Sequence, residues 1–429
     1  MSVDYVVLAR KYRPQTFEEV VGQEGVTTTL RNALASGRVA HAYLFSGPRG
    51  VGKTTTARLL AKALNCDRGP TPDPCNACQF CTSITNGDDL DVIEIDAASN
   101  TSVDDVRVLR DNVRFAPARA RYKVYIIDEV HMLSRSAFNA FLKTLEEPPP
   151  HVKFIFCTTE PHRLPDTIHS RCQRFDFRRI STADIVRRLR QLCAQEKTEA
   201  DDAAMYLIAR STKGGMRDAE TLLDQLTSYG GGRVTAQNVE EALGALPRRD
   251  IFALLDHLAA RKADAALAII HRALQDGKDT ESLLNQLIDH VRSLLLLGVC
   301  GPQAGLLDET PEDIKELDRQ RQRFTPDALL YMSQVLWDTL RKVKESAQSR
   351  LPIELAVVKL AQGDGIQPLA EILQRLQALE ARLGGGAAPA ARPGPPAQPV
   401  PAPAGRPAEP MGREVEKKKG PYSPRASSG

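Results

Sequence analysis

The chain contains 429 residues, of which 42% are hydrophobic and 26% are charged, and its formal net charge is +3. This composition is ordinary for a globular chain and excludes collagens and small disulfide-bonded scaffolds. Unbroken apolar runs are only a few residues long, whereas a membrane-spanning helix needs ~20 apolar residues, and the N-terminus lacks the apolar core of a signal peptide. We therefore expect a soluble, cytosolic protein with about three domains.

Residues 1–180 alternate short apolar runs with helical patterns. Four apolar runs predict strands that are buried on both faces: 42–45, 92–95, 124–127 and 154–157. Helical periodicity marks residues 106–113 and 138–145, and three prolines follow the second segment. Strands that alternate with helices form a parallel sheet covered on both faces, so we expect an α/β fold here.

A phosphate-binding loop follows the first predicted strand. Residues 47–54 match the pattern G-x-x-x-x-G-K-[ST], and a helix is predicted directly after it, over 54–64. Glycines let backbone N–H groups turn inward around phosphate oxygens, and the helix N-terminus attracts anions. Lys53 would reach the β- and γ-phosphates of ATP, and Thr54 would bind Mg²⁺. The predicted nucleotide-binding residues are Gly47, Pro48, Arg49, Gly50, Val51, Gly52, Lys53, Thr54 and Thr55.

Two acidic residues follow the predicted strand at 124–127. Carboxylates at the C-terminal end of a parallel strand face the ligand crevice. Asp128 would hold Mg²⁺, and Glu129 would orient and polarise the attacking water. Two solvated acids at a strand end are the alternative. We interpret His131 as a packing or hydrogen-bonding residue.

Four of the eight cysteines lie close together, as C-x8-C-x2-C-x2-C. The residues are Cys66, Cys75, Cys78 and Cys81. Four thiolates close a tetrahedron and leave no open position, so this spacing predicts a structural zinc site. Free thiols, disulfides or an iron–sulfur cluster are the alternatives. The other four are interpreted as small buried side chains: Cys157, Cys172, Cys193 and Cys300.

After residue 180 the sequence pattern changes from alternating strands and helices to helices. Residues 181–243 predict several short helices, and 249–360 predict longer ones. Six leucines and isoleucines between 369 and 383 form one apolar stripe, which indicates an amphipathic helix. Residues 384–429 contain 11 of the 28 prolines and few large apolar side chains, so we expect a disordered tail. The tail also accounts for the positive net charge of the chain, since residues 1–383 carry 50 basic and 51 acidic side chains.

These motifs together resemble a known family. The opening LARKYRPQTFEEVVGQE, the segment HAYLFSGPRGVGKTTTARLLAKALNC, the cysteine module, VYIIDEVHMLS, FNAFLKTLEEPP and TTEPHRLPDTIHSRC are similar to the bacterial DNA polymerase III gamma/tau subunits. Those proteins are the clamp-loader ATPases of the AAA+ class. The resemblance is dense over 8–224 and looser to about residue 360.

The resemblance implies roles for further residues. Thr159 resembles the sensor of the γ-phosphate, and Thr158 is the near-equal candidate. Arg171 resembles the arginine finger, which acts on ATP held by a neighbouring subunit, and Arg217 resembles the second sensor. The planar guanidinium group of arginine pairs well with phosphate oxygens. For both arginines the alternative is a surface salt bridge. The residues expected to border the adenine are Arg10, Tyr12, Pro14 and 20–22.

The resemblance also implies a domain order and a set of partners. We expect an α/β P-loop NTPase core of the AAA+ class at 1–180, with the zinc insertion at 66–81. An all-helical lid at 181–245, a helical collar for oligomerisation at 246–365, an amphipathic helix at 366–383 and the tail at 384–429 would follow. The partners would be the delta and delta prime subunits, further copies of this chain, the beta sliding clamp and primer–template DNA. The polymerase core and the replicative helicase would be partners only of a longer form.

Two other functions fit parts of the sequence. The tetrad at 128–131 resembles the DExH box of helicase-type translocases. Those translocases have two tandem motor cores, whereas this sequence predicts one P-loop core followed by helices, which disfavours this function. A zinc-containing scaffold with a structural P-loop is disfavoured by Glu129 and Arg171, which such a subunit would not need. We therefore expect ATP, Mg²⁺ and structural Zn²⁺ as cofactors, and a location in the cytoplasm at the replisome.

Overall fold

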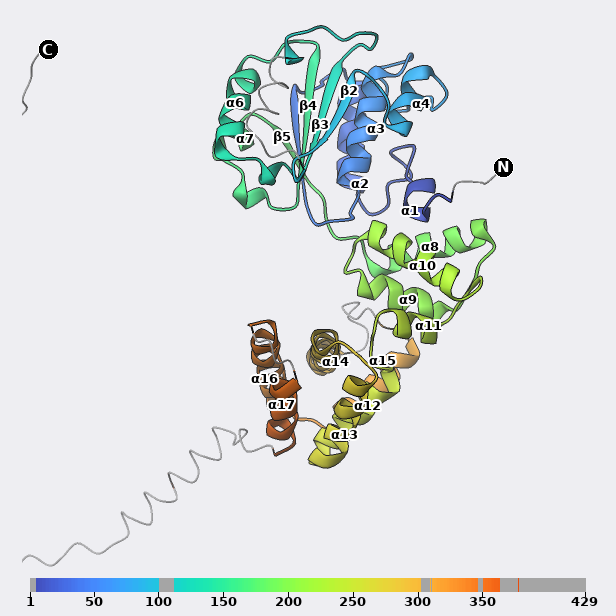
Figure 1. The fold of residues 1–429 in the computed structure, drawn as a ribbon, viewed down its shortest axis with the longest axis vertical. Helices are drawn as coiled ribbons and strands as arrows, with labels where there is room; N and C mark the ends of the chain where they lie inside the picture. The colour runs from blue at the N-terminus through green and yellow to red at the C-terminus, as the bar shows by residue number, and fades with distance from the viewer. Residues whose placement is uncertain are drawn as a thin grey trace, which may run out of the picture. The chain divides into compact units, whose positions relative to one another are not determined.

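A computed structural model describes residues 5–99, 112–301, 309, 311–345, 350–362 and 377 (Figure 1). Most of the helix predicted at 106–113, nearly all of the stripe at 366–383 and the whole tail at 384–429 lie outside the described residues.

The N-terminal part contains a five-stranded parallel sheet with the order β2-β3-β4-β1-β5. The strands are β1 Ala42–Ser46, β2 Val92–Asp96, β3 Lys123–Asp128, β4 Val152–Thr158 and β5 Gln173–Asp176. The four predicted strands are confirmed, and β5 was not predicted. The expectation that β2 is buried on both faces is wrong, because β2 is an edge strand and Glu94 is exposed on it.

Helices cover both faces of this sheet, and each face has its own hydrophobic core. In Figure 1, α2 and α3 lie on one side of the strands and α6 and α7 on the other. The helices of this part are α2 Glu24–Ala35, α3 Lys53–Asn65, α4 Gln79–Asn86, α6 Arg135–Glu146 and α7 Asp166–His169. The α/β arrangement expected from the alternating pattern is therefore confirmed.

A small helical region follows the sheet and has a separate core. Its elements are α8 Thr182–Glu196, α9 Asp202–Ser211, α10 Met216–Tyr229 and α11 Ala236–Ala242, with two-residue strands β6 Glu199–Ala200 and β7 Arg233–Val234. Ser181 caps α8, because its side chain accepts a hydrogen bond from the backbone N–H of Asp184. The short helix α1 Leu8–Lys11 buries Leu8 in the same core, so the N-terminal segment joins this region.

The last described part consists of helices around one large core. They are α12 Arg248–Ala259, α13 Ala263–Gln275, α14 Thr280–Cys300, α15 Pro311–Arg321, α16 Pro326–Glu345 and α17 Arg350–Gln362. Among the described helices, α14 alone has the length and hydropathy of a membrane span. Ten of its residues are buried by the neighbouring helices, which accounts for its apolar composition in the core of a helical domain.

Candidate nucleotide and metal sites

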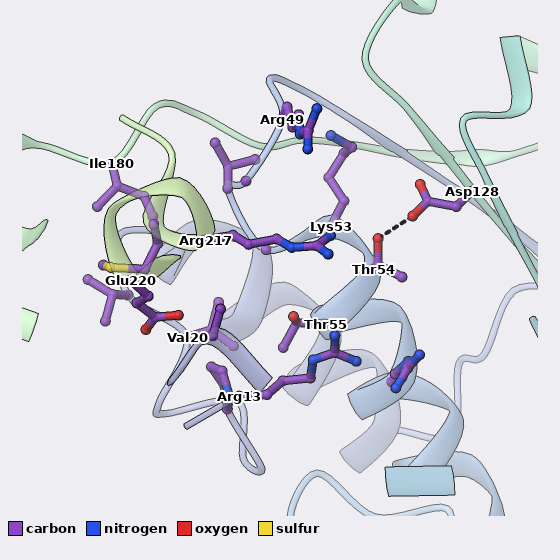
Figure 2. A pocket seen from close by; sticks show the side chains of 18 of the residues that line it. Arg13, Val20, Arg49, Lys53, Thr54, Thr55, Asp128, Ile180, Arg217 and Glu220 are labelled. Atoms are coloured by element: carbon purple, nitrogen blue, oxygen red, sulfur yellow. Dashed lines mark hydrogen bonds between the residues drawn. The ribbon is translucent and has the colours of Figure 1, made fainter. Parts of the chain in front are cut away.

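A cavity of about 520 Å³ opens over the N-terminus of α3. Its lining includes the loop before α3 and the start of α3, the N-terminal segment around Arg13, the ends of β2 and β3, and helices α8 and α10 (Figure 2). Of the predicted nucleotide-binding residues, Arg49 to Thr55 line this cavity, whereas Gly47 and Pro48 do not. Of the residues expected around the adenine, Pro14, Val20 and Val21 line it, and Arg10, Tyr12 and Gly22 do not.

The loop before α3 has the backbone of a phosphate cradle. Gly50 and Gly52 adopt left-handed conformations with φ of 76° and 101°, which other residues rarely adopt. At Gly47 a Cβ atom would overlap the carbonyl oxygen of Phe177, so this position also needs glycine. The Lys53 side chain is buried, and its Nζ donates to the carbonyl oxygens of Gly47 at 2.8 Å and Pro48 at 2.7 Å. Burial lowers the pKa of Lys53.

The two predicted magnesium ligands are in contact. Thr54 Oγ1 donates a 2.6 Å hydrogen bond to Asp128 Oδ2, and Figure 2 draws this bond. The other carboxylate oxygen, Asp128 Oδ1, accepts the backbone N–H of Glu129 at 2.9 Å. A hydroxyl and a carboxylate oxygen placed together beside a phosphate loop are the ligand types that Mg²⁺ takes. The pair therefore fits the metal.

Glu129 and the end of β4 form a polar cluster next to this pair. Glu129 has a φ of 46°, a left-handed conformation that costs a non-glycine residue energy and that is concentrated at functional sites. Its Oε2 accepts the hydroxyl of Thr159 at 2.9 Å and the backbone N–H of the same residue at 3.3 Å. Thr158 is fully buried instead, and its Oγ1 lies 3.1 Å from His131 Nδ1. The two candidate threonines thus have different neighbours.

Arg171 and Arg217 lie in different surroundings. Arg217 lines the cavity, points into it from α10 and donates its backbone N–H to Gly50 O at 3.4 Å (Figure 2). Arg171 does not line the cavity and bonds Glu146 Oε1 at 2.7 Å on the surface. The structure therefore brings Arg217, but not Arg171, to the same cavity as Lys53.

Charged residues that the sequence did not single out also line the cavity: Arg13, Arg58, Glu94, Arg188 and Glu220. Burial raises the pKa of Glu220 to about 7, although Arg188 Nε lies 3.7 Å from its Oε1. Burial also lowers the pKa of Arg13. Glu220 follows Arg217 by three positions on α10, so helical spacing from the predicted sensor was the signal that could have located it.

The four clustered cysteines come together in one site. Their Sγ atoms all lie within 4.8 Å of one another, and Cys75 Sγ is 4.0 Å from Cys81 Sγ. Sulfurs around zinc at ~2.3 Å lie ~3.8 Å apart, so this cluster fits a tetrahedral Zn²⁺ with little adjustment. Backbone N–H groups of Ala77 and Cys78 lower the pKa of Cys75 to about 6, and burial raises the pKa of Cys81.

The remaining cysteines are not part of this cluster. Cys157 and Cys193 are buried and Cys172 is half-buried, as expected for small core side chains. Cys300 is exposed, so the expectation for this residue is wrong. It ends α14, where the chain leaves the core of the helical domain.

Three protein families match successive parts of the chain. Residues 22–181 match the family described as DNA polymerase III, delta subunit. Residues 184–232 match the ATPase lid domain of DNA polymerase III clamp loader subunits, and 234–376 match domain III of subunits gamma and tau.

Individual relatives match over longer stretches. The chain is 46% identical to DNA polymerase III subunit tau of Bacillus subtilis, over 84% of this chain and 64% of the relative. It is 42% identical to subunit tau of Escherichia coli, over 86% of this chain and 57% of the relative. With DNA polymerase III subunit gamma of Buchnera aphidicola the identity is 44%, over 67% of this chain and 79% of the relative. The chain thus spans about three fifths of the tau relatives and most of the gamma relative.

Solved structures show more distant likeness. The Holliday junction branch migration motor RuvB of Thermotoga maritima has a TM-score of 0.41 and 19% identity, over 57% of this chain and 78% of that one. The clamp loader delta protein of Bacillus subtilis has a TM-score of 0.36 and 15% identity, over 78% and 99%.

Proposed function

Because this chain belongs to the family of bacterial DNA polymerase III gamma and tau subunits, we propose that it is an ATP-hydrolysing motor subunit of a replicative clamp loader. It would use ATP to open the ring-shaped sliding clamp and would leave the clamp closed around primed DNA. One observation carries the proposal, namely that Thr54, Asp128 and Glu129 meet at the carboxyl edge of the sheet, beside a glycine-rich loop. Attack of water on a γ-phosphate requires a loop that holds the phosphates, ligands for Mg²⁺ and a residue that orients the water. Polar residues at the carboxyl ends of strands beside the loop can supply the last two.

The chain's own residues would divide the chemistry as follows. Lys53 would leave the carbonyl oxygens of Gly47 and Pro48 and reach the β- and γ-phosphates. Thr54 and Asp128 would hold Mg²⁺, which supplies positive charge against the phosphate oxygens. Glu129 would orient the attacking water. Thr159, which bonds Glu129, would report whether a γ-phosphate is present.

The two arginines would act from different subunits. Arg217 would contact the nucleotide of its own chain, since it lines the same cavity as Lys53. Arg171 would supply charge to ATP held by an adjacent subunit of the ring, in place of its present ion pair with Glu146. An arginine supplied in trans makes hydrolysis depend on assembly.

The remaining assignments concern the cysteines, the partners and the location. Zn²⁺ at the four cysteines would be structural, because four thiolates leave no open coordination position. The partners would be delta, delta prime and further copies of this chain, together with the beta sliding clamp and primer–template DNA. The polymerase core and replicative helicase would join only a longer form. The complex would work in the cytoplasm, at the replisome.

The test is the ATPase activity of the chain reconstituted with loader partners, with and without sliding clamp and primed DNA. We expect stimulation by clamp plus primed DNA, and a fall of about 100-fold or more in Glu129→Gln. Strand displacement by the chain alone would support a DExH-type translocase instead. Equal activity in wild type and Glu129→Gln would favour a scaffold with a silent P-loop.

A further inference from the structure

The last turn of α3 carries a lysine that is buried to an unusual degree. Lys62 is 2% exposed and is one of the largest fully buried side chains of the described chain. Its Nζ donates a 2.8 Å hydrogen bond to Gln15 Oε1, which belongs to a neutral amide. Burying an ammonium group is costly unless a negative charge compensates it. The surroundings of Lys62 should therefore contain an anionic group.

The cysteine cluster supplies that charge when metal is bound. Lys62 precedes Cys66 by one helical turn, and the backbone N–H of Cys66 donates to Lys62 O at 2.8 Å. The ammonium group lies within electrostatic reach of Cys81, Cys75 and Cys66, and of the carboxylate of Glu19. Four thiolates around one divalent ion carry a net charge of about −2. Lys62 is therefore placed to neutralise part of the charge of a filled site, as outer partners of metal sites do.

Gln15 connects this lysine to the nucleotide cavity. On one side, its Oε1 lies 3.1 Å from the hydroxyl of Thr85 on α4, and the proton of this hydroxyl is shared with the carbonyl oxygen of Cys81 at 2.8 Å. On the other side, Gln15 Nε2 donates to Arg13 O at 2.9 Å, and its backbone N–H donates to Glu19 Oε2 at 2.7 Å. Both Arg13 and Glu19 line the cavity over α3. One amide side chain thus joins the cysteine module to the nucleotide-binding wall.

We propose that Lys62 and Gln15 couple metal binding at the four cysteines to nucleotide binding in the cavity. The inference rests on the proposed zinc and ATP sites. When zinc is bound, its thiolates hold Lys62 in place, Lys62 holds Gln15, and Gln15 holds the segment 13–19 against the cavity. When zinc leaves, the ammonium group keeps the charge of Glu19 but loses that of the metal-bound thiolates, and this support loosens. Because binding free energies are reciprocal, ATP must then strengthen zinc binding by the same factor.

The experiment measures two affinities in the full chain. ATP affinity is measured with a fluorescent ATP analogue, before and after zinc is removed by a chelator, and zinc affinity is measured by competition with a chromophoric chelator, with and without ATP. We expect ATP affinity to fall about fivefold or more without zinc, and zinc affinity to rise by the same factor with ATP. Equal ATP affinity in the two forms, with the helical circular dichroism unchanged, would overturn the coupling.

Variants locate the coupling at these residues. Gln15→Ala should keep zinc content and abolish the effect of zinc on ATP affinity. Thr85→Val should weaken the coupling, whereas Thr82→Val on the same helix should not, because Thr82 bonds only carbonyl oxygens of its own helix turn. Lys62→Met should release zinc faster to the chelator. If Lys62→Met fails to fold, Gln15→Ala still decides, since full coupling in that variant contradicts the proposal.

Failure of the coupling can be told apart from failure of the proposed function. A wild-type chain that binds no zinc by metal analysis, or no ATP analogue, contradicts the proposed sites themselves. A chain that binds both, each without influence on the other, contradicts only the link through Lys62 and Gln15.

Discussion

Thr54 and Asp128 form a 2.6 Å hydrogen bond although they lie 74 positions apart in the sequence. Thr54 belongs to the first turn of α3, which follows β1, and Asp128 ends β3. These strands are not neighbours, since β4 lies between them in the sheet. The contact is therefore a property of the sheet order, which places the two proposed magnesium ligands together.

The variant Asp128→Asn tests this arrangement. The new amide oxygen would keep the hydrogen bond from the Thr54 hydroxyl, but the side chain would lack the negative charge that a hard cation needs. We expect ATP to bind about tenfold more weakly in the presence of Mg²⁺, and hydrolysis to fall by about 100-fold. Titration with an ATP analogue at several Mg²⁺ concentrations gives the answer. A Mg²⁺ dependence equal to that of wild type would remove Asp128 from the metal site.

The two threonines at the end of β4 should respond differently. Thr159→Val removes the 2.9 Å hydrogen bond to Glu129, so ATP should bind normally while hydrolysis falls by about 100-fold. Thr158→Val leaves His131 without its buried hydroxyl partner, so the free energy of unfolding should fall by about 1–3 kcal/mol. Steady-state ATPase rates and thermal unfolding of both variants distinguish the two. The reverse pattern would make Thr158 the sensor.

Arg171→Ala tests catalysis between subunits. Its ion pair with Glu146 is largely solvated, with side chains 32% and 52% exposed, so its loss should change stability by less than about 1 kcal/mol. ATP binding should persist, and hydrolysis in the assembled complex should fall by about 1000-fold.

A matched control is available on the neighbouring strand. Arg174 is also exposed and pairs with Asp176, so Arg174→Ala should leave turnover unchanged. Mixing Arg171→Ala with a chain that carries Lys53→Ala should restore part of the activity, because each chain supplies what the other lacks. Normal hydrolysis by Arg171→Ala in the full complex would show that another residue supplies the charge.

The sequence predicted the parts of the site whose pattern is local. The loop at 47–54 and the acids at 128–129 each follow directly after a predicted strand. Because the carboxyl ends of parallel strands lie at the same edge of a sheet, the sequence predicts that the loop and the acids lie close together. The four cysteines were predicted for the same reason, since their spacing alone brings the sulfurs together. The four apolar runs predicted strands correctly, but the burial on both faces that such runs indicate holds only for β1, β3 and β4, since β2 is an edge strand.

Other features depend on contacts between distant segments. β5 is short, and three of its four residues are exposed, so no apolar run marks it; its parallel pairing with β1 makes it a strand. Glu220 and Lys62 lie in ordinary amphipathic helices, where a charged residue predicts a solvent-facing position. Both are buried in contact with residues distant in the sequence, Lys62 with Gln15 and Glu220 with Arg188, and nothing in the sequence predicts these contacts.

Glu220 makes the stability of the lid helix depend on pH. Burial raises its pKa from 4.5 to about 7, even with Arg188 beside it and Arg13 nearby. The folded chain therefore holds a proton that the unfolded chain has lost between pH 4.5 and 7. The contribution of Glu220 to the free energy of unfolding is therefore greatest below pH 4.5, falls as the pH rises to 7, and is then constant. The total loss is about 3 kcal/mol.

Glu220→Gln isolates this effect, since glutamine has a similar shape and does not titrate. We expect the variant to match wild type near pH 4 and to exceed it increasingly toward pH 8, with a difference of about 3 kcal/mol in the opening of α10. Hydrogen exchange of the α10 amides, compared between the two chains at each pH, measures this difference because the intrinsic exchange rates cancel. A difference that stays constant from pH 5 to 8 would mean that Glu220 is already ionised in the folded chain.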